Sequence, residues 1–98
     1  MPTSKEVAEW MIAQVDARDE LSQQDAAKKI ARLFGSEFIY RDKYSNLAIA
    51  ARVFSQFRKL TPDSVVWVTH QGGGFCPDAH WRKRERYDAP GRTQYIEG

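Results

Sequence analysis

The chain has 98 residues, of which 42% are hydrophobic and 29% charged, and its formal net charge is +2. This length and composition are typical of one folded domain and argue against intrinsic disorder. The core of so short a chain is small, so we expect surface grooves and patches rather than a deep active-site cavity. The single cysteine, Cys76, excludes an intramolecular disulfide and fits a reducing compartment.

Neither a signal peptide nor a membrane span is expected, because the first ten residues include Lys5, Glu6 and Glu9 and no apolar run approaches about 18 residues. We therefore expect a cytoplasmic protein that does not contact the membrane. Charge is uneven along the chain: residues 1–49 hold seven Lys/Arg and eight Asp/Glu, whereas residues 50–98 hold eight and five. The second half is the basic half and the better candidate for contact with a polyanion.

Two amphipathic helices are predicted in the first third of the chain. The first covers residues 5–17 after Thr3 or Ser4 as N-cap, with a stripe of Val7, Ala8, Met11, Ile12 and Val15 and with Trp10 at its edge. The second covers residues 23–34. Its signals are Ser22 as N-cap, Asp25 at the third helical position in a variant of the capping box, and Gly35 as the residue that ends it.

Residues 38–40 are predicted to form a short strand, followed by a polar turn over residues 41–46. Residues 47–50 are ambiguous: they either pair back as a second short strand or open the third helix with Ser45 or Asn46 as cap. The third helix itself is clear from the stripe of Val53, Phe54, Phe57 and Leu60, and it ends at residues 61–64.

The last third of the chain predicts a β-hairpin. Residues 65–69 are β-branched apart from Trp67, and residues 80–82 follow after a tip that contains Gly72, Gly73 and Gly74. Residues 85–98 show no periodicity and are expected to form an extended or partly mobile tail. The prediction is therefore one α+β domain over residues 1–84, with three helices and a C-terminal β-hairpin, and a tail.

This order of elements resembles the winged-helix variant of the helix-turn-helix fold over about residues 5–84. The resemblance implies that the third helix, near residues 52–59, enters a major groove, and that the hairpin near residues 70–82 contacts phosphates or a minor groove. One feature departs from the usual pattern, in which a small strand lies between the first and second helices. Here the small strand is expected after the second helix.

Three stretches, LSQQDAAKKIARLFG, FRKLTPDSVVW and HWRKRERYDAPGR, also resemble a small bacterial family of unknown function. That resemblance supports a bacterial cytoplasmic origin and implies no activity. No residue role follows from it.

Basic side chains near aromatic residues are the strongest functional candidates. Guanidinium groups bind phosphate oxygens, and flanking aromatic rings stack on bases, so the strip between Trp81 and Tyr87 suits a polyanion. The alternative is an edge strand kept soluble by its charge. On the third helix, Arg and Gln are able to read bases, although any exposed helix face carries such residues. The predicted nucleic-acid-binding residues are Arg52, Gln56, Arg58, Lys59, Arg82, Lys83, Arg84 and Arg86.

Metal binding and catalysis have weaker signals. His70, Cys76 and His80 lack the paired spacing of zinc sites, so no metal or cofactor is predicted, although whether they converge stays open. The glycine run is not a phosphate-binding loop, because no Lys, Ser or Thr follows at that spacing. No nucleophile elbow or similar motif is present, so we expect no enzyme.

The leading hypothesis is an accessory or regulatory module that binds nucleic acid, with DNA as the candidate partner, through the third helix and the basic hairpin. The alternative is a protein-interaction domain or small homodimer that binds no nucleic acid. The chain has many large aromatic side chains for a small core, so some of them are available as an exposed association surface. The sequence specifies neither the target nor the oligomeric state.

Overall fold

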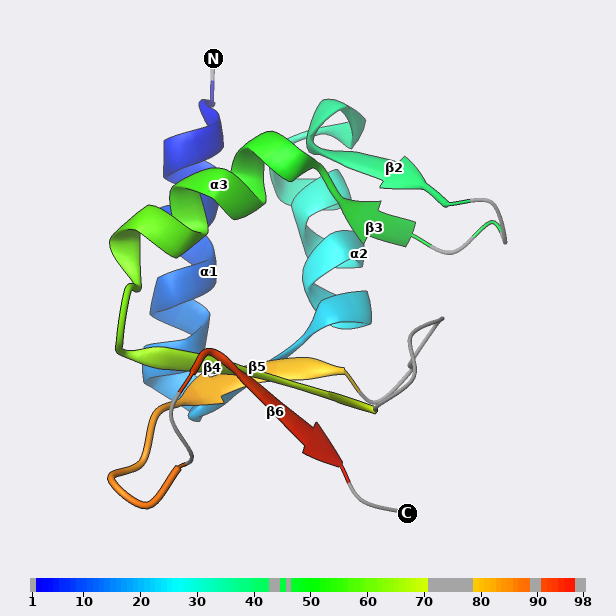
Figure 1. The fold of residues 1–98 in the computed structure, drawn as a ribbon. Helices are drawn as coiled ribbons and strands as arrows, with labels where there is room; N and C mark the ends of the chain where they lie inside the picture. Colours follow the sequence, from blue (N-terminus) through cyan, green and yellow to red (C-terminus); the bar gives the residue numbers. More distant parts are fainter. Residues whose placement is uncertain (1, 43–44, 46, 71–78, 89–90, 97–98) are drawn as a thin grey trace.

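The amphipathic stripes of the sequence form helices that pack around one apolar interior. The computed structural model describes residues 2–42, 45, 47–70, 79–88 and 91–96. Its α-helices are α1 (Ser4–Arg18), α2 (Gln23–Leu33) and α3 (Ala51–Leu60), and a short 3-10 helix, η1, covers Ser36–Phe38. Figure 1 shows α3 crossing α1, against which it makes its main helix–helix contact, with the larger sheet below the helices.

The strands form one four-stranded sheet and one two-stranded sheet. They are β1 (Glu20–Ser22), β2 (Ile39–Arg41), β3 (Leu47–Ile49), β4 (Val65–His70), β5 (His80–Lys83) and β6 (Thr93–Ile96). The larger sheet has the order β1-β5-β4-β6, in which β5 is antiparallel to both of its neighbours and β6 runs parallel to β4. The smaller sheet pairs β2 with β3. The prediction of a small α+β domain with three helices is confirmed, although the strands form more than the predicted hairpin.

Local signals explain where the first two helices begin. The Thr3 hydroxyl accepts a hydrogen bond from the Glu6 amide at 3.1 Å and caps α1, as predicted. Ser22 is the N-cap of α2, but its side chain makes no capping hydrogen bond. Because Ser22 also ends β1, the helix start is instead held by the sheet: the Gln23 amide donates to the Ala79 carbonyl at 3.1 Å.

The two strand-like segments around the predicted turn pair with each other. Ile39 lies opposite Ile49 in the β2–β3 pair, so the ambiguity over residues 47–50 resolves to a strand. The third helix begins only at Ala51, with Ala50 as its N-cap, so Ser45 does not cap it; Asn46 lies outside the described residues. The hairpin prediction is also confirmed, because β4 and β5 pair with Trp67 opposite Trp81.

Two strands of the larger sheet were not expected from the sequence. The prediction that the small strand follows the second helix was incomplete, because β1 lies between α1 and α2 and pairs with β5. Residues 93–96, within the segment expected to be a tail, form β6 beside β4. Each of these strands takes its position from a partner far away in the sequence, which local propensity does not report.

The core lies between the helices and the inner face of the larger sheet. Met11 of α1, Ile30 of α2 and Val53 of α3 are fully buried and belong to one contact cluster, which also contains Phe57 and Trp81. Trp10 lies at the edge of this core, as predicted, with its ring edge-to-face against Phe34 at 6.0 Å between centroids. The aromatic part of the cluster joins α3 to the sheet and positions the site described next.

Candidate functional site

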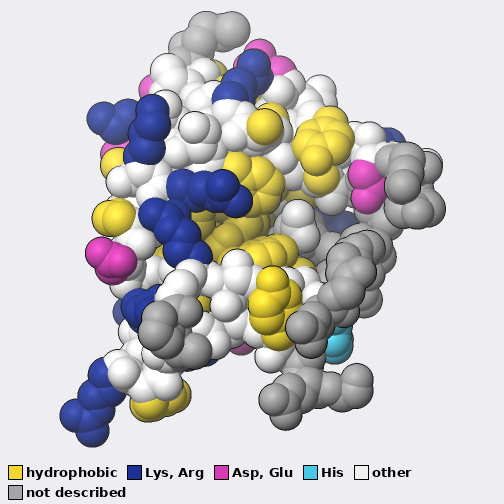
Figure 2. Space-filling model, in the orientation of Figure 1, with side chains coloured by type: hydrophobic (Ala, Val, Ile, Leu, Met, Phe, Trp, Pro, Cys, Tyr) yellow, Lys and Arg dark blue, Asp and Glu magenta, His cyan; other side chains and the backbone are white. Residues whose placement is uncertain are grey.

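A groove of about 670 Å³ lies between α3 and the larger sheet. Its floor is aromatic: α3 contributes Phe54 and Phe57, β4 contributes Trp67, and β5 contributes Trp81. Figure 2 shows this hydrophobic floor exposed in a hollow on the face that carries α3 and the sheet. The groove is therefore an apolar site open to solvent.

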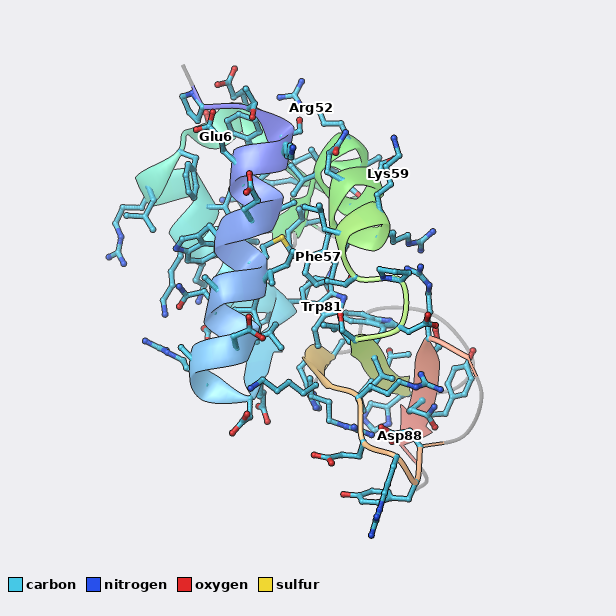
Figure 3. The ribbon with its side chains drawn as sticks, turned by 90° about the vertical axis from the view of Figure 1, so that its left-hand side faces the viewer. Glu6, Arg52, Phe57, Lys59, Trp81 and Asp88 are labelled. Atoms are coloured by element: carbon cyan, nitrogen blue, oxygen red, sulfur yellow. The ribbon has the colours of Figure 1, made fainter. Side chains whose placement is uncertain are left out.

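The strand register and the helix spacing together build this floor. Pairing of β4 with β5 places Trp67 directly opposite Trp81, and their ring centroids are 4.6 Å apart. Phe54 and Phe57, three residues apart on α3, reach Trp81 with centroid distances of 5.5 Å each. Phe57 and Trp81 are buried by these contacts, whereas Phe54 and Trp67 stay partly exposed. Figure 3 shows Phe57 and Trp81 meeting between α3 and the sheet.

Three exposed cations line the same groove. Arg58 and Lys59 occupy the last turn of α3, and Arg92 immediately precedes β6. Two hydrogen bonds hold the backbone of Arg92 and its guanidinium in place: the Trp67 amide donates to the Arg92 carbonyl at 2.6 Å, and Arg92 Nη2 donates to the Arg58 carbonyl at 3.3 Å. Arg92 therefore lies beside the end of α3, although 33 residues separate it from Lys59 in the sequence.

The rim of the groove is positive. Its described lining contains Arg58, Lys59 and Arg92 and no aspartate or glutamate. Figure 2 shows Lys and Arg side chains at one border of the hydrophobic hollow. An aromatic floor with cations along its edge suits a ligand that is both planar and anionic.

The predicted basic strip of β5 has a different environment. Arg82 donates to both carboxylate oxygens of Asp88, at 2.9 and 2.5 Å, and Lys83 pairs with Asp19 at 3.3 Å. Arg84 donates to the Gly91 carbonyl at 2.6 Å. Hydrogen bonds from Arg82 and from the Glu85 amide lower the pKa of the Asp88 carboxyl to about 2. These contacts tie the strip to Asp88 and Gly91, which follow it in the sequence, and to Asp19 at the end of α1.

The surface around this strip is balanced in charge. A shallow depression is lined by three cations and four carboxylates: Lys83, Arg84, Arg86, Asp16, Asp63, Glu85 and Asp88. The sequence shows five cations and two acids over residues 80–92, but the fold brings further carboxylates from α1 and from the turn before β4. The strip is therefore less positive in space than it is along the chain.

The predicted residues of α3 also separate. Arg58 and Lys59 line the groove, whereas Arg52 lies at the opposite end of α3, where its Nη2 donates to the Glu37 carbonyl at 2.7 Å. The Arg52 guanidinium also lies 5.1 Å from the centre of the Phe38 ring. Gln56 is partly buried and is not among the groove-lining residues. Figure 3 shows Arg52 and Lys59 at the two ends of the helix.

Three residues of the groove, Arg92, Phe54 and Trp67, are not among the predicted binding residues. Arg92 falls in the segment expected to be a tail, Phe54 in the apolar stripe of the third helix, and Trp67 in a predicted strand. The β-branched and aromatic residues of Thr93–Ile96 favour a strand, but no local signal reports its pairing with β4, which places Arg92 at the groove.

The described residues also show how the candidate metal ligands are placed and whether any helix could span a membrane. Cys76 lies outside the described residues, while His70 and His80 lie on the neighbouring strands β4 and β5. Within the described ranges, no cluster of three or more His, Cys, Asp or Glu side chains is arranged to hold a metal ion. The helices of the same ranges are too short or too polar to cross a bilayer.

Comparison with known proteins places the chain in a family without adding an activity. No curated protein and no solved structure matches it. A family model described as "Family of unknown function (DUF6953)" matches residues 3–72, which include α1 to α3 and β4 and therefore Arg58, Lys59 and Trp67. The match ends before Trp81 and Arg92. Because it spans well over half of the chain, the protein belongs to this family of unknown function, DUF6953.

Proposed function

We propose that this domain binds nucleic acid through the groove between α3 and the larger sheet, as an accessory or regulatory module. The observation that carries the proposal is the positive rim: Arg58, Lys59 and Arg92 line one groove with no acidic residue in its described lining. Cations that lack carboxylate neighbours are available to phosphate oxygens. The strip at Arg82 and Lys83 is secondary, because its charges have acidic partners.

The order of elements supports the proposal. The position of β1 between α1 and α2, and the adjacency of β1, β5 and β4 in that order, support the proposed resemblance to a winged helix. The β2–β3 pair is an insertion between α2 and α3, and β6 is an addition at the edge of β4. The resemblance implies a nucleic-acid-binding surface that includes α3, which is the helix that carries Arg58 and Lys59.

Salt dependence gives the proposal a quantitative form. Each phosphate contact contributes a slope of about −0.9 to log K against log salt on duplex DNA and about −0.7 on a single strand. Three groove cations therefore predict a slope of about −2 to −3, which is weaker than that of a large DNA-binding surface.

The test is fluorescence-anisotropy titration of the full chain with labelled duplex and single-stranded oligonucleotides at several salt concentrations. Replacing Arg58 and Lys59 together with Ala should weaken binding and make the slope shallower by one to two phosphate contacts. The matched control is Lys28→Ala with Arg32→Ala, which removes two exposed cations from α2 and should leave affinity unchanged. Equal effects of the two double variants, or no binding by the wild type, would contradict the proposal.

A second candidate is a protein-interaction domain or homodimer. The observation that favours it is the exposure of large apolar side chains on adjoining elements: Leu33 of α2 is 57% exposed and Tyr40 of β2 is 53% exposed. Light scattering of the purified chain tests self-association. A dimeric mass that Leu33→Ser with Tyr40→Ser reduces to that of the monomer would support this candidate.

A further inference from the structure

We infer that the groove takes an unpaired base of single-stranded nucleic acid, stacked against the exposed rings of Phe54 and Trp67, with the adjoining phosphates on Arg58, Lys59 and Arg92. The inference rests on the proposed function and adds the class of ligand. It also assigns a binding role to two aromatic side chains that the core does not fully cover.

The shape of the floor is the first argument. Phe57 and Trp81 are buried and form its support, whereas Phe54 and Trp67 keep part of their surfaces open to the groove. A planar group that enters between α3 and the sheet therefore contacts aromatic surface. In a duplex, each base face is covered by the neighbouring base pairs, so an unpaired base is the form of nucleic acid that offers such a face.

The size of the groove is the second argument. Its volume of about 670 Å³ lies within the range of sites that bind small organic ligands, about 300–1,000 Å³, and a nucleotide belongs to that size class. The groove is thus large enough for a base with its sugar.

The arrangement of charge is the third argument. Arg92 bonds to the backbone of Arg58, and Lys59 is the next residue, so the three cations form one edge of the groove. A strand whose base occupies the aromatic floor places its flanking phosphates along such an edge. This combination of a stacking surface and a cationic track is the general mode of single-strand binding.

The geometry of α3 does not favour contacts with base edges in the major groove of a duplex. Of the residues suited to major-groove contacts, Arg52 is bonded to the Glu37 carbonyl and lies over Phe38, and Gln56 is partly buried. The cations that remain exposed at the end of the helix, Arg58 and Lys59, border the aromatic groove. We therefore expect these cations to contact phosphate rather than base edges.

The experiment uses intrinsic tryptophan fluorescence together with anisotropy. The full chain is titrated with oligothymidylate and with oligouridylate of about 12 nucleotides, a length that covers typical single-strand sites, and with a duplex of the same length. Both single strands should quench tryptophan emission, and the duplex should bind more weakly and leave it unquenched. A preference between the two single strands identifies DNA or RNA as the natural source.

Two sets of variants locate the contact. Phe54→Ala should weaken single-strand binding about five-fold to one-hundred-fold and change duplex binding less than about two-fold, because base stacking is lost while the cations remain. Trp67→Phe should remove most of the quenching. Trp10→Phe is its matched control, because Trp10 packs on Phe34 and is not part of the groove lining, and it should retain the quenching.

Circular dichroism checks that each variant is folded, and Phe54→Leu replaces Phe54→Ala if the latter is not. The inference is overturned, with the proposed function intact, if single-strand and duplex affinities respond to the Arg58 and Lys59 substitutions but not to those at Phe54. It is also overturned if Trp67→Phe leaves the quenching unchanged. Absence of binding to every oligonucleotide overturns both proposals.

Discussion

Replacing Phe57 with Ala should remove much of the stability of the domain. The Phe57 side chain is 3% exposed, and its ring lies edge-to-face against Trp81 with centroids 5.5 Å apart, so it is the main buried aromatic contact from α3 to the sheet. Truncation of a buried Phe to Ala costs about 3–5 kcal/mol in free energy of unfolding. A domain typically has about 5–15 kcal/mol in total. Each kcal/mol lost lowers Tm by about 4–8 °C at this chain length, so Tm should fall by more than about 10 °C.

The measurement is urea unfolding followed by far-UV circular dichroism, with the m-value checked for a common two-state transition. Leu60→Ala is the matched control because Leu60 is on the same helix and 40% exposed, and it should cost less than about 1 kcal/mol. If the two variants were equally stable, Phe57 would not join α3 to the sheet. The aromatic floor described above would then be wrong.

Three further substitutions test separate features. The pKa of Asp88 is about 2 in the fold and 3.8 is its ordinary value, so the unfolded chain takes up this proton first as pH falls. Asp88→Asn should therefore be less stable than the wild type at neutral pH, and this difference should shrink between about pH 4 and pH 2. A difference that does not depend on pH would contradict the ion pair. Gly35→Ala should cost about 1–3 kcal/mol in thermal unfolding although no atom obstructs the new Cβ, because φ is +114° there, while Ser36→Ala should cost far less. Thr61→Val should cost about 1 kcal/mol in urea unfolding, because the buried Thr61 hydroxyl donates to the Phe57 carbonyl at 2.7 Å, and Thr61→Ser should retain most of that stability.

Elements with their own periodicity were predictable from the sequence. The apolar stripe of Val7, Met11 and Val15 placed α1 within one residue of its observed ends, because helix spacing is a local signal. The β-branched run from Val65 likewise identified β4. By contrast, β1 contains Glu20 and only one buried side chain, and its pairing with β5 spans some sixty residues. No local pattern reports a partner at that distance.

The candidate site was predictable only in part for the same reason. Arg58 and Lys59 were identified from their positions on an amphipathic helix, and the structure places both at the groove. The charge of the strip at Arg82 was overestimated, because the sequence does not show that Asp88 folds back onto it in bidentate geometry. Arg92 depended on the parallel pairing of β6 with β4, which is a tertiary event. Composition locates charges along the chain, whereas folding determines which of them are neutralised.

Backbone and indole NMR shifts of the full chain during titration with a single-stranded oligonucleotide would locate the binding site residue by residue. The largest changes should occur at the amides of Lys59 and Thr93 and at the indole of Trp67, all of which line the groove. The indole of Trp10, which packs on Phe34, should stay unchanged. Changes confined to residues 82–88, or spread evenly over the domain, would contradict the groove as the binding site.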